Sequence, residues 1–295
     1  MNTTSAFVIA IGAVAIGSML RVDLAGADDQ DLRVRREASS ITTLTFADGG
    51  TRTVDLRTIN GTIKVTTDGG RDVRLTTTRR TAAEREIDLA DADRNVRLET
   101  ASQGGTVSAI VHDRENVCGE SNNSRNDSWW DRRRYQVRVD LVAVIPQGTR
   151  IRLCTINGES VVANGTFGEF DVSNVNGRVE VTGVRGSGRA VTVNGPVDVT
   201  FAESPRDGSE FRTVNGNVIV RFPSDLSADL KLKTFHGELL TDFDVQSLPT
   251  TSTRQERNGR VIYRAGTTTV RVGRGGPTLT FDTLNGDVRI LRVGR

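Results

Sequence analysis

Residues 148–195 read GTRIRLCTIN GESVVANGTF GEFDVSNVN GRVEVTGVR GSGRAVTVN G, with glycines at positions 148, 158, 168, 177, 186 and 195. These six glycines are spaced 10, 10, 9, 9 and 9 residues apart. Between them lie short runs of Val, Ile, Phe and Thr, which fit a pleated, half-buried surface, and glycine can adopt the positive φ of a corner. This alternation of strand and corner predicts an all-β chain whose coils stack as a β-solenoid.

The same corner recurs well outside this stretch. Seven copies of the pair are Asn60-Gly61, Asn157-Gly158, Asn176-Gly177, Asn194-Gly195, Asn215-Gly216, His236-Gly237 and Asn285-Gly286. A Thr stands three residues before each Gly, with Asn174 as the exception, and apolar residues alternate with polar ones after it. Asn tolerates the left-handed conformation, and the alternation indicates one buried and one wet face. We therefore expect structural turns at these pairs, in coils of about 18–21 residues, with hydrogen-bonded ladders of stacked Thr and Asn.

Asn-Gly between alternating apolar residues is also typical of a two-residue β-hairpin, so an antiparallel meander is the competing architecture. The residue two before each Gly distinguishes the two, because a hairpin would place it on the polar face. That residue is apolar in every copy: Ile59, Ile156, Val175, Val193, Val214, Phe235 and Leu284. An apolar residue there suits a corner that turns its side chain inward, which favours the solenoid.

The N-terminal residues 1–27 have the features of a signal peptide. Ala6–Leu20 is an uncharged run, and Ala25-Gly26-Ala27 offers a small-residue cleavage site. Fifteen residues are short of the ~20 that a spanning helix needs. A cleaved secretory signal is therefore favoured over a retained anchor or a buried core helix, and no transmembrane span is expected in the mature chain.

The remaining sequence divides into three parts: a charged segment at 28–40, an irregular β region at 41–147 with a long loop at 113–134, and regular coils at 148–295. Strands of the irregular region are expected at Ile41–Phe46, Thr53–Leu56, Thr62–Thr66, Val73–Thr77, Val96–Leu98, Thr106–Val111 and Tyr135–Ile145. Thr81–Ala92 contains helix formers, so a short helix is an alternative for this segment in a region that is otherwise mostly strands. We expect this half to cap the stack, because an open ladder of strands needs a cover. Residues 244–276 interrupt the coils before the last copy.

Composition limits the partners. There are 39 basic and 37 acidic residues, a formal net charge of +2, which does not indicate binding to nucleic acid. Hydrophobic residues make up 36% of the chain, and aromatic residues only 5%. That is little for a large globular core, but a stack of coils shares one narrow core among its neighbours.

Several motifs in their order carry a family resemblance. They are LRTINGTIKV at 56–65, YQVRV at 135–139, VIPQG at 144–148, FRTVNGNV at 211–218, RFPSDLSADLKLKTFHG at 221–237 and FDTLNGDV at 281–288. Over residues 41–293 the chain resembles the bacterial putative-adhesin family, a domain of unknown function built from β-strand repeats. The resemblance implies an exported or envelope-associated β-solenoid and carries over no catalytic or ligand residues. His236, Asn174 and the segment Glu115–Arg134 depart from the family pattern.

That segment ends in the only two tryptophans of the chain and a run of arginines. The candidate binding residues are Trp129, Trp130, Arg132, Arg133, Arg134 and Tyr135. Indoles beside guanidinium groups can stack sugars or hold an anionic polymer. The alternative is that one Trp covers the end of the core and the arginines are simply solvated.

Cys118 and Cys154 are the only cysteines. In an exported chain they would pair, tethering the loop to the first regular coil, and two free thiols are the alternative. Two Cys and two His at scattered positions lack metal-ligand spacing, so neither a metal nor another cofactor is predicted.

The case for catalysis is poor. His112 and His236 fit structural or solvated roles, and no nucleophile elbow, zinc-protease motif or phosphate loop with a following helix is present. Outward charges at Arg178, Asp171, Glu180 and Asp198 mean that a polysaccharide lyase or hydrolase remains an alternative function.

We expect an exported, non-enzymatic surface or envelope module. An envelope regulatory or scaffold protein is the other alternative, and the partner would be an envelope protein or a polysaccharide. Its open ends leave room for end-to-end self-association.

Overall fold

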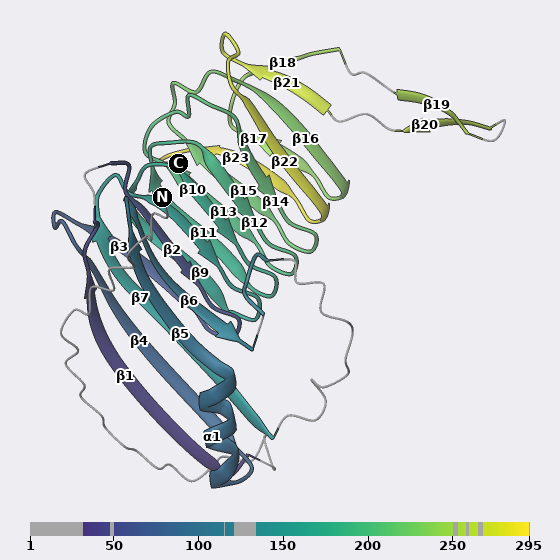
Figure 1. The fold of residues 1–295 in the computed structure, drawn as a ribbon. Coiled ribbons are helices and arrows are strands. Elements are labelled where there is room, and N and C mark those ends of the chain that lie inside the picture. The colour runs from purple at the N-terminus through teal and green to yellow at the C-terminus, as the bar shows by residue number, and fades with distance from the viewer. Residues whose placement is uncertain are drawn as a thin grey trace, which may run out of the picture. The chain divides into compact units, whose positions relative to one another are not determined.

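The computed structural model describes residues 32–47, 50–114, 116–120, 134–249, 253–257, 260–264 and 268–294. The predicted signal peptide at 1–27 lies outside these residues. The strands form two large mixed sheets and one two-stranded sheet (Figure 1). The all-β prediction is therefore confirmed. The chain divides after Gly158 into two compact units, which we describe in turn.

The first unit contains most of the region predicted to be irregular. Its elements are β1 (Val34–Leu44), β2 (Thr53–Arg57), β3 (Ile63–Asp68), β4 (Val73–Ala83), α1 (Glu86–Asn95), β5 (Val96–Gln103), β6 (Thr106–Asp113), β7 (Tyr135–Pro146) and β8 (Arg150–Cys154). All seven expected strand positions carry strands. The short helix that was the alternative at 81–92 forms later, at Glu86–Asn95, because Thr81–Ala83 still pairs with β1 and β7.

Two kinds of pairing occur in this unit. Strand β2 pairs in parallel with β6 and β8, and β3 pairs in parallel with β7. The β6–β7 connection is thus equivalent to the β2–β3 connection, with the long loop in place of the short corner at 58–61. Antiparallel strands lie at the outer edges, where β4 pairs with β7, β1 with β4 and β5 with β6.

The second unit contains the regular coils. Its strands are β9 (Ser160–Phe167), β10 (Phe170–Ser173), β11 (Arg178–Val184), β12 (Gly188–Val191), β13 (Val197–Phe201), β14 (Ser209–Arg212), β15 (Val218–Phe222), β16 (Ala228–His236), β17 (Leu239–Thr241), β18 (Val245–Ser247), β19 (Thr253–Arg257), β20 (Arg260–Arg264), β21 (Thr268–Val272), β22 (Thr278–Asn285) and β23 (Val288–Arg292). Five coils each consist of two strands joined by a corner: β10–β11, β12–β13, β14–β15, β16–β17 and β22–β23.

Neighbouring coils run in the same direction. Strand β13 pairs in parallel with β11 and β15, and β14 pairs in parallel with β12 and β22. The antiparallel meander that Asn-Gly also permits is therefore wrong for these coils. Equivalent residues face each other, as Val197 and Val218 do. Each coil consequently places the same kind of side chain above its neighbour. Figure 1 shows the strands of these coils side by side.

The order of the coils in space differs from their order in the sequence. Strand β22 lies between β14 and β16, and β23 lies between β15 and β17. The last copy of the repeat therefore inserts between the two copies that precede it in the chain. The segment that was expected only to interrupt the series supplies β18 and β21, and β21 pairs antiparallel with β16.

Aromatic and β-branched side chains fill the interior of the second unit. Phe201 and Phe222 stack with ring centroids 4.8 Å apart, and Phe211 and Phe281 stack at 5.1 Å. All four rings are buried. Because residues pair in register, an aromatic position repeated in neighbouring coils brings two rings into contact. A narrow core of this kind explains why so few aromatic residues suffice.

The corners are held by contacts from one coil to the next. A Cβ added at Gly286 would lie 2.1 Å from the carbonyl oxygen of Gly216, so the backbones approach too closely for any side chain. The threonine ladder forms differently from our expectation: Thr192 donates its hydroxyl proton not to another Thr but to the carbonyl of Gly177, at 2.9 Å. Asn also acts differently, since Arg114 is the only non-glycine with positive φ among the described residues.

Candidate functional site

An exposed row of amide side chains runs along the corners of the second unit. Asn194 donates to the side-chain oxygen of Asn176 at 2.9 Å, Asn215 to that of Asn194 at 2.8 Å, and Asn285 to that of Asn215 at 2.7 Å. His236 continues the row, with its Nδ1 3.1 Å from the side-chain oxygen of Asn285. We call these five residues the amide row.

A second row, of apolar side chains, lies beside it. It consists of Val175, Val193, Val214, Leu284 and Phe235, in the order of the coils in space. We call it the apolar corner row. We predicted that these side chains turn inward, and for this unit that prediction is wrong: Val193 is 37% exposed, Leu284 46% and Phe235 74%. The buried Thr of the corner points inward, so the next residue points outward.

A shallow groove crosses β10, β12, β14 and β22 of the 11-stranded sheet, away from the corners. Its volume is about 510 Å³, and its lining includes Asp171, Arg189, Glu210, Thr278 and Thr280. Arg189 and Glu210 form an ion pair at 3.2 Å across neighbouring coils. The groove thus brings the predicted Asp171 near a paired Arg and Glu.

The other charged candidates lie on the opposite sheet. Glu180 pairs with Arg178 at 3.3 Å, and Asp198 pairs with Arg221. Glu180 and Asp198 face each other in adjacent coils. Each carboxylate therefore has an arginine partner, an arrangement that neutralises charge on a solvated sheet face.

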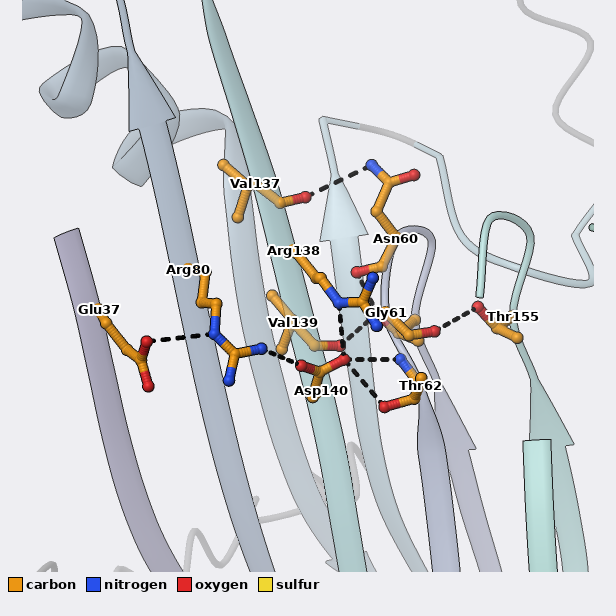
Figure 2. Close-up of polar contacts among 11 residues, drawn as sticks. Glu37, Asn60, Gly61, Thr62, Arg80, Val137, Arg138, Val139, Asp140 and Thr155 are labelled. Carbon is orange, nitrogen blue, oxygen red and sulfur yellow. Dashed lines mark hydrogen bonds and ion pairs between the residues drawn. The ribbon is translucent and has the colours of Figure 1, made fainter. Parts of the chain in front are cut away.

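The first unit contains a polar network centred on Asp140 (Figure 2). One carboxylate oxygen accepts from the backbone N–H of Thr62 at 2.8 Å, from its hydroxyl at 3.0 Å and from Arg138 at 3.1 Å. The other accepts from Arg80 at 2.6 Å, and Arg80 also donates to Glu37 at 3.1 Å. Burial raises the pKa of Asp140, but these donors outweigh it and hold the pKa below its ordinary value. The network links three neighbouring strands, β1, β4 and β7, to Thr62 in the corner before β3, and we assign it a structural role.

The long loop is joined to the end of β8. Cys118 and Cys154 form a disulfide, with Cα atoms 5.7 Å apart. Arg57 reaches the loop from β2, donating to the carbonyl of Cys118 at 3.4 Å, and forms a two-point ion pair with Asp55 at 2.8 Å. The disulfide and the Arg57 hydrogen bond therefore hold the described start of the loop against the ends of β2 and β8.

Only part of the predicted aromatic and arginine patch can be placed. Trp129, Trp130, Arg132 and Arg133 lie outside the described residues. Arg134 is exposed, 3.7 Å from Glu84. Tyr135 is buried, and its hydroxyl accepts from Asn95 on α1 at 2.9 Å. The prediction that Tyr135 belongs to a surface patch is therefore wrong, because as the first residue of β7 it points inward beneath the helix.

Both histidines lie in strands. His112, on β6, is 3.3 Å from Glu99 of β5, and His236 is part of the amide row. Among the described residues, no group of three or more His, Cys, Asp or Glu side chains could hold a metal ion. Within the same residues, no helix has the length and apolar character needed to cross a bilayer.

Sequence reasoning did not identify the apolar corner row as a surface. Its signal was present, because the same position is apolar in all seven copies. Periodicity shows that a position is equivalent in every coil, but it does not show on which side of a corner the side chain lies.

No family model matches the chain, and neither does any curated protein. Solved structures with some likeness include one described as a putative cell adhesion protein from Clostridium sporogenes, 9% identical, with a TM-score of 0.34, covering 87% of this chain and 100% of its own. A putative adhesin from Bacteroides fragilis is 10% identical, with a TM-score of 0.26, over 86% and 97% of the two chains. A putative adhesin from Parabacteroides merdae is 8% identical, with a TM-score of 0.21, over 86% and 96%. At these scores the likeness supports no functional argument.

Proposed function

We propose that this chain is an exported, non-enzymatic β-solenoid of the putative-adhesin type, which acts as a binding or structural module at the cell surface or envelope. The observation that carries the proposal is the register of the coils. The same corner contacts repeat along the stack, from Thr192 bonded to Gly177 to Thr283 bonded to Gly216. Such a stack presents similar side chains at a fixed spacing, which suits a partner that is itself extended.

Two sequence features support export. The N-terminal segment has the pattern of a secretory signal. The pairing of Cys118 with Cys154 is of the kind that persists in oxidising compartments. The order of the motifs at 56–65, 211–218 and 281–288 also supports export, because it resembles the putative-adhesin family.

The test is retention by envelope material. The chain beginning at Asp28, immobilised through its C-terminus, should retain an envelope protein or polysaccharide from extracts of the cells that produce it. A matched column carrying the same chain irreversibly denatured by heat gives the background. Equal recovery from both columns, or a chain that remains in the cytoplasm on fractionation, would contradict the proposal.

The competing function is a carbohydrate-active enzyme, favoured by the groove that contains Asp171 and Glu210. A glycosidase needs two carboxylates at a defined separation, one of which gives up a proton. In the groove the Glu210 carboxylate is instead engaged by Arg189 of the neighbouring coil, at 3.2 Å. Polymer depolymerisation by the purified chain, lost in Asp171→Asn or Glu210→Gln, would establish the enzyme in place of the binding module.

A further inference from the structure

The two corner rows of the second unit form an exposed strip of distinctive chemistry. Its members repeat once per coil, and coils in a sheet are about 4.8 Å apart. On one side are the amides of Asn194, Asn215 and Asn285, and on the other the side chains of Val193, Val214 and Leu284. Phe235, the most exposed, ends the strip, with its ring 4.6 Å from that of His236.

The amides retain hydrogen-bonding capacity toward the solvent. A primary amide has two N–H donors and two acceptor lone pairs. In Asn215, the bonds along the row use one N–H, toward Asn194, and one lone pair, toward Asn285. The same holds for Asn194, which donates to Asn176 and accepts from Asn215. Asn194 and Asn215 can therefore each offer a ligand one donor and one acceptor, in an orientation fixed by the row itself.

The strip carries no carboxylate, ammonium or guanidinium group. The adjacent charges lie on the strands and pair with each other, as Lys233 does with Asp282 at 3.5 Å and Arg212 with Asp282 at 3.9 Å. A charged polymer would gain little from such a strip, because its charges would meet neutral amides. A neutral ligand gives up less hydration on binding there.

We propose that this strip binds an extended neutral polysaccharide that lies along the stack. A pyranose ring has C–H faces that pack on aliphatic or aromatic side chains, and hydroxyl groups at its edge that both donate and accept hydrogen bonds. One sugar unit advances by nearly the distance between coils. The apolar corner row meets the ring faces, the amide row meets the hydroxyls, and Phe235 stacks on the terminal ring. This inference rests on the proposed binding function and names the ligand class of one site.

A second copy of the chain is the other occupant to consider. A stable protein interface buries about 1,200 Å² or more in total, with a broad apolar centre. The apolar corner row is one side chain wide, and Val175 and Val214 are only partly exposed. A strip this narrow suits a linear polymer better than a protein surface.

The test is titration calorimetry of the full chain with two neutral probes, cellohexaose and xylohexaose, and one anionic probe of equal length, hexagalacturonate. At least one neutral probe should bind, and more tightly than the anionic one. The double variant Leu284→Ser/Phe235→Ser should weaken that binding by about tenfold or more, because it removes most of the exposed apolar area. The conservative Leu284→Phe should retain it. Ile87→Ser, at an exposed residue on α1, is the matched control and should bind like the original chain.

Phe235 is 74% exposed and Leu284 46%, and neither lies in the buried core, so the variants should fold, which the unfolding midpoint checks. Unchanged affinity in the double variant, or no binding of either neutral probe, overturns the inference. A dimer in light scattering that the double variant dissociates also overturns it, and makes the strip an interface between copies. If envelope material is still retained while the probes fail, only this inference falls; if retention is lost too, the proposed function falls with it.

Discussion

The hydroxyl of Thr213 donates a hydrogen bond, 2.8 Å long, to the carbonyl oxygen of Gly195 in the neighbouring coil. The same contact links Thr283 to Gly216 at 3.1 Å and Thr234 to Gly286 at 3.0 Å. Thr and Gly are therefore two halves of one contact between coils. The Gly lets the backbones of the two coils approach each other. The Thr hydroxyl donates a hydrogen bond to a carbonyl oxygen that the corner would otherwise leave without a partner.

Replacing Thr213 by Val keeps the branched shape but removes the donor. We expect Thr213→Val to lower the free energy of unfolding by about 1–2 kcal/mol, since a buried carbonyl loses its partner. Thr200→Val is the control, because Thr200 lies on the outward face of β13 and is half-buried. Urea denaturation followed by circular dichroism measures both. Equal stability of the two variants would show that the Thr–Gly contact contributes nothing.

Gly286 tests the other half of the contact. Its φ is +148°, and an added Cβ would lie 2.1 Å from the carbonyl oxygen of Gly216. We expect Gly286→Ala to destabilise the chain by about 1–3 kcal/mol, because the coils must move apart. Gly69→Ala should change stability by less than about 1 kcal/mol, since nothing lies within 4 Å of the new methyl group. Thermal unfolding of both variants and the original chain measures the effect. The prediction fails if Gly286→Ala and Gly69→Ala have the same unfolding midpoint.

The position of every regular corner could be predicted from the sequence, because the Asn-Gly pairs recur with a nearly constant period and alternating apolar residues follow them. The order of the coils could not. The pairing of Asn215 with Asn285 shows that the last copy inserts before the copy containing His236. All copies have the same apolar face, so any order buries it, and the repeat pattern alone does not choose between the orders.

The candidate site was predictable in composition but not in orientation. An apolar residue two before Gly is visible in all seven copies, yet Ile59 is buried whereas Phe235 is 74% exposed. Ile59 has strands on both sides of its coil, from β6 and β8. Phe235 lies in β16, whose antiparallel partner β21 reaches only to Leu232. Adjacent coils alone do not decide burial here, because Leu284 has a coil on either side and is still 46% exposed. Ile59 instead lines a small cavity with Val96, Val111 and Val137, which lie far from it in the sequence.

The disulfide should stabilise the chain through its loop. Cys118 and Cys154 are 36 residues apart, and in the loop-entropy model closing such a loop contributes about 3–4 kcal/mol. We expect Cys118→Ser/Cys154→Ser to lose roughly that amount, measured by urea denaturation without reductant. Adding reductant to the original chain should produce the same loss. If the double variant and the original chain unfold at the same denaturant concentration, the bond contributes no stability.

Asp140 should make stability depend on pH. Burial alone would raise its pKa, but the hydrogen bonds from Thr62 and the charge of Arg138 lower it below the ordinary value of about 3.9. Because the folded chain binds this proton less readily than the unfolded chain, the contribution is complete above pH ~4. It is lost as the pH falls through the lower, folded value.

Asp140→Asn should therefore be less stable than the original chain at pH 7, and the difference should shrink between pH ~4 and pH ~2. Asp229 and Asp287 also have lowered pKa values, through Arg271 and through the backbone N–H of Glu238 respectively, so both chains lose stability in acid. The informative quantity is the difference between the two chains, measured by urea denaturation at each pH. A difference that stays constant from pH 7 to pH 2 would show that the Asp140 carboxylate is not stabilised by its donors.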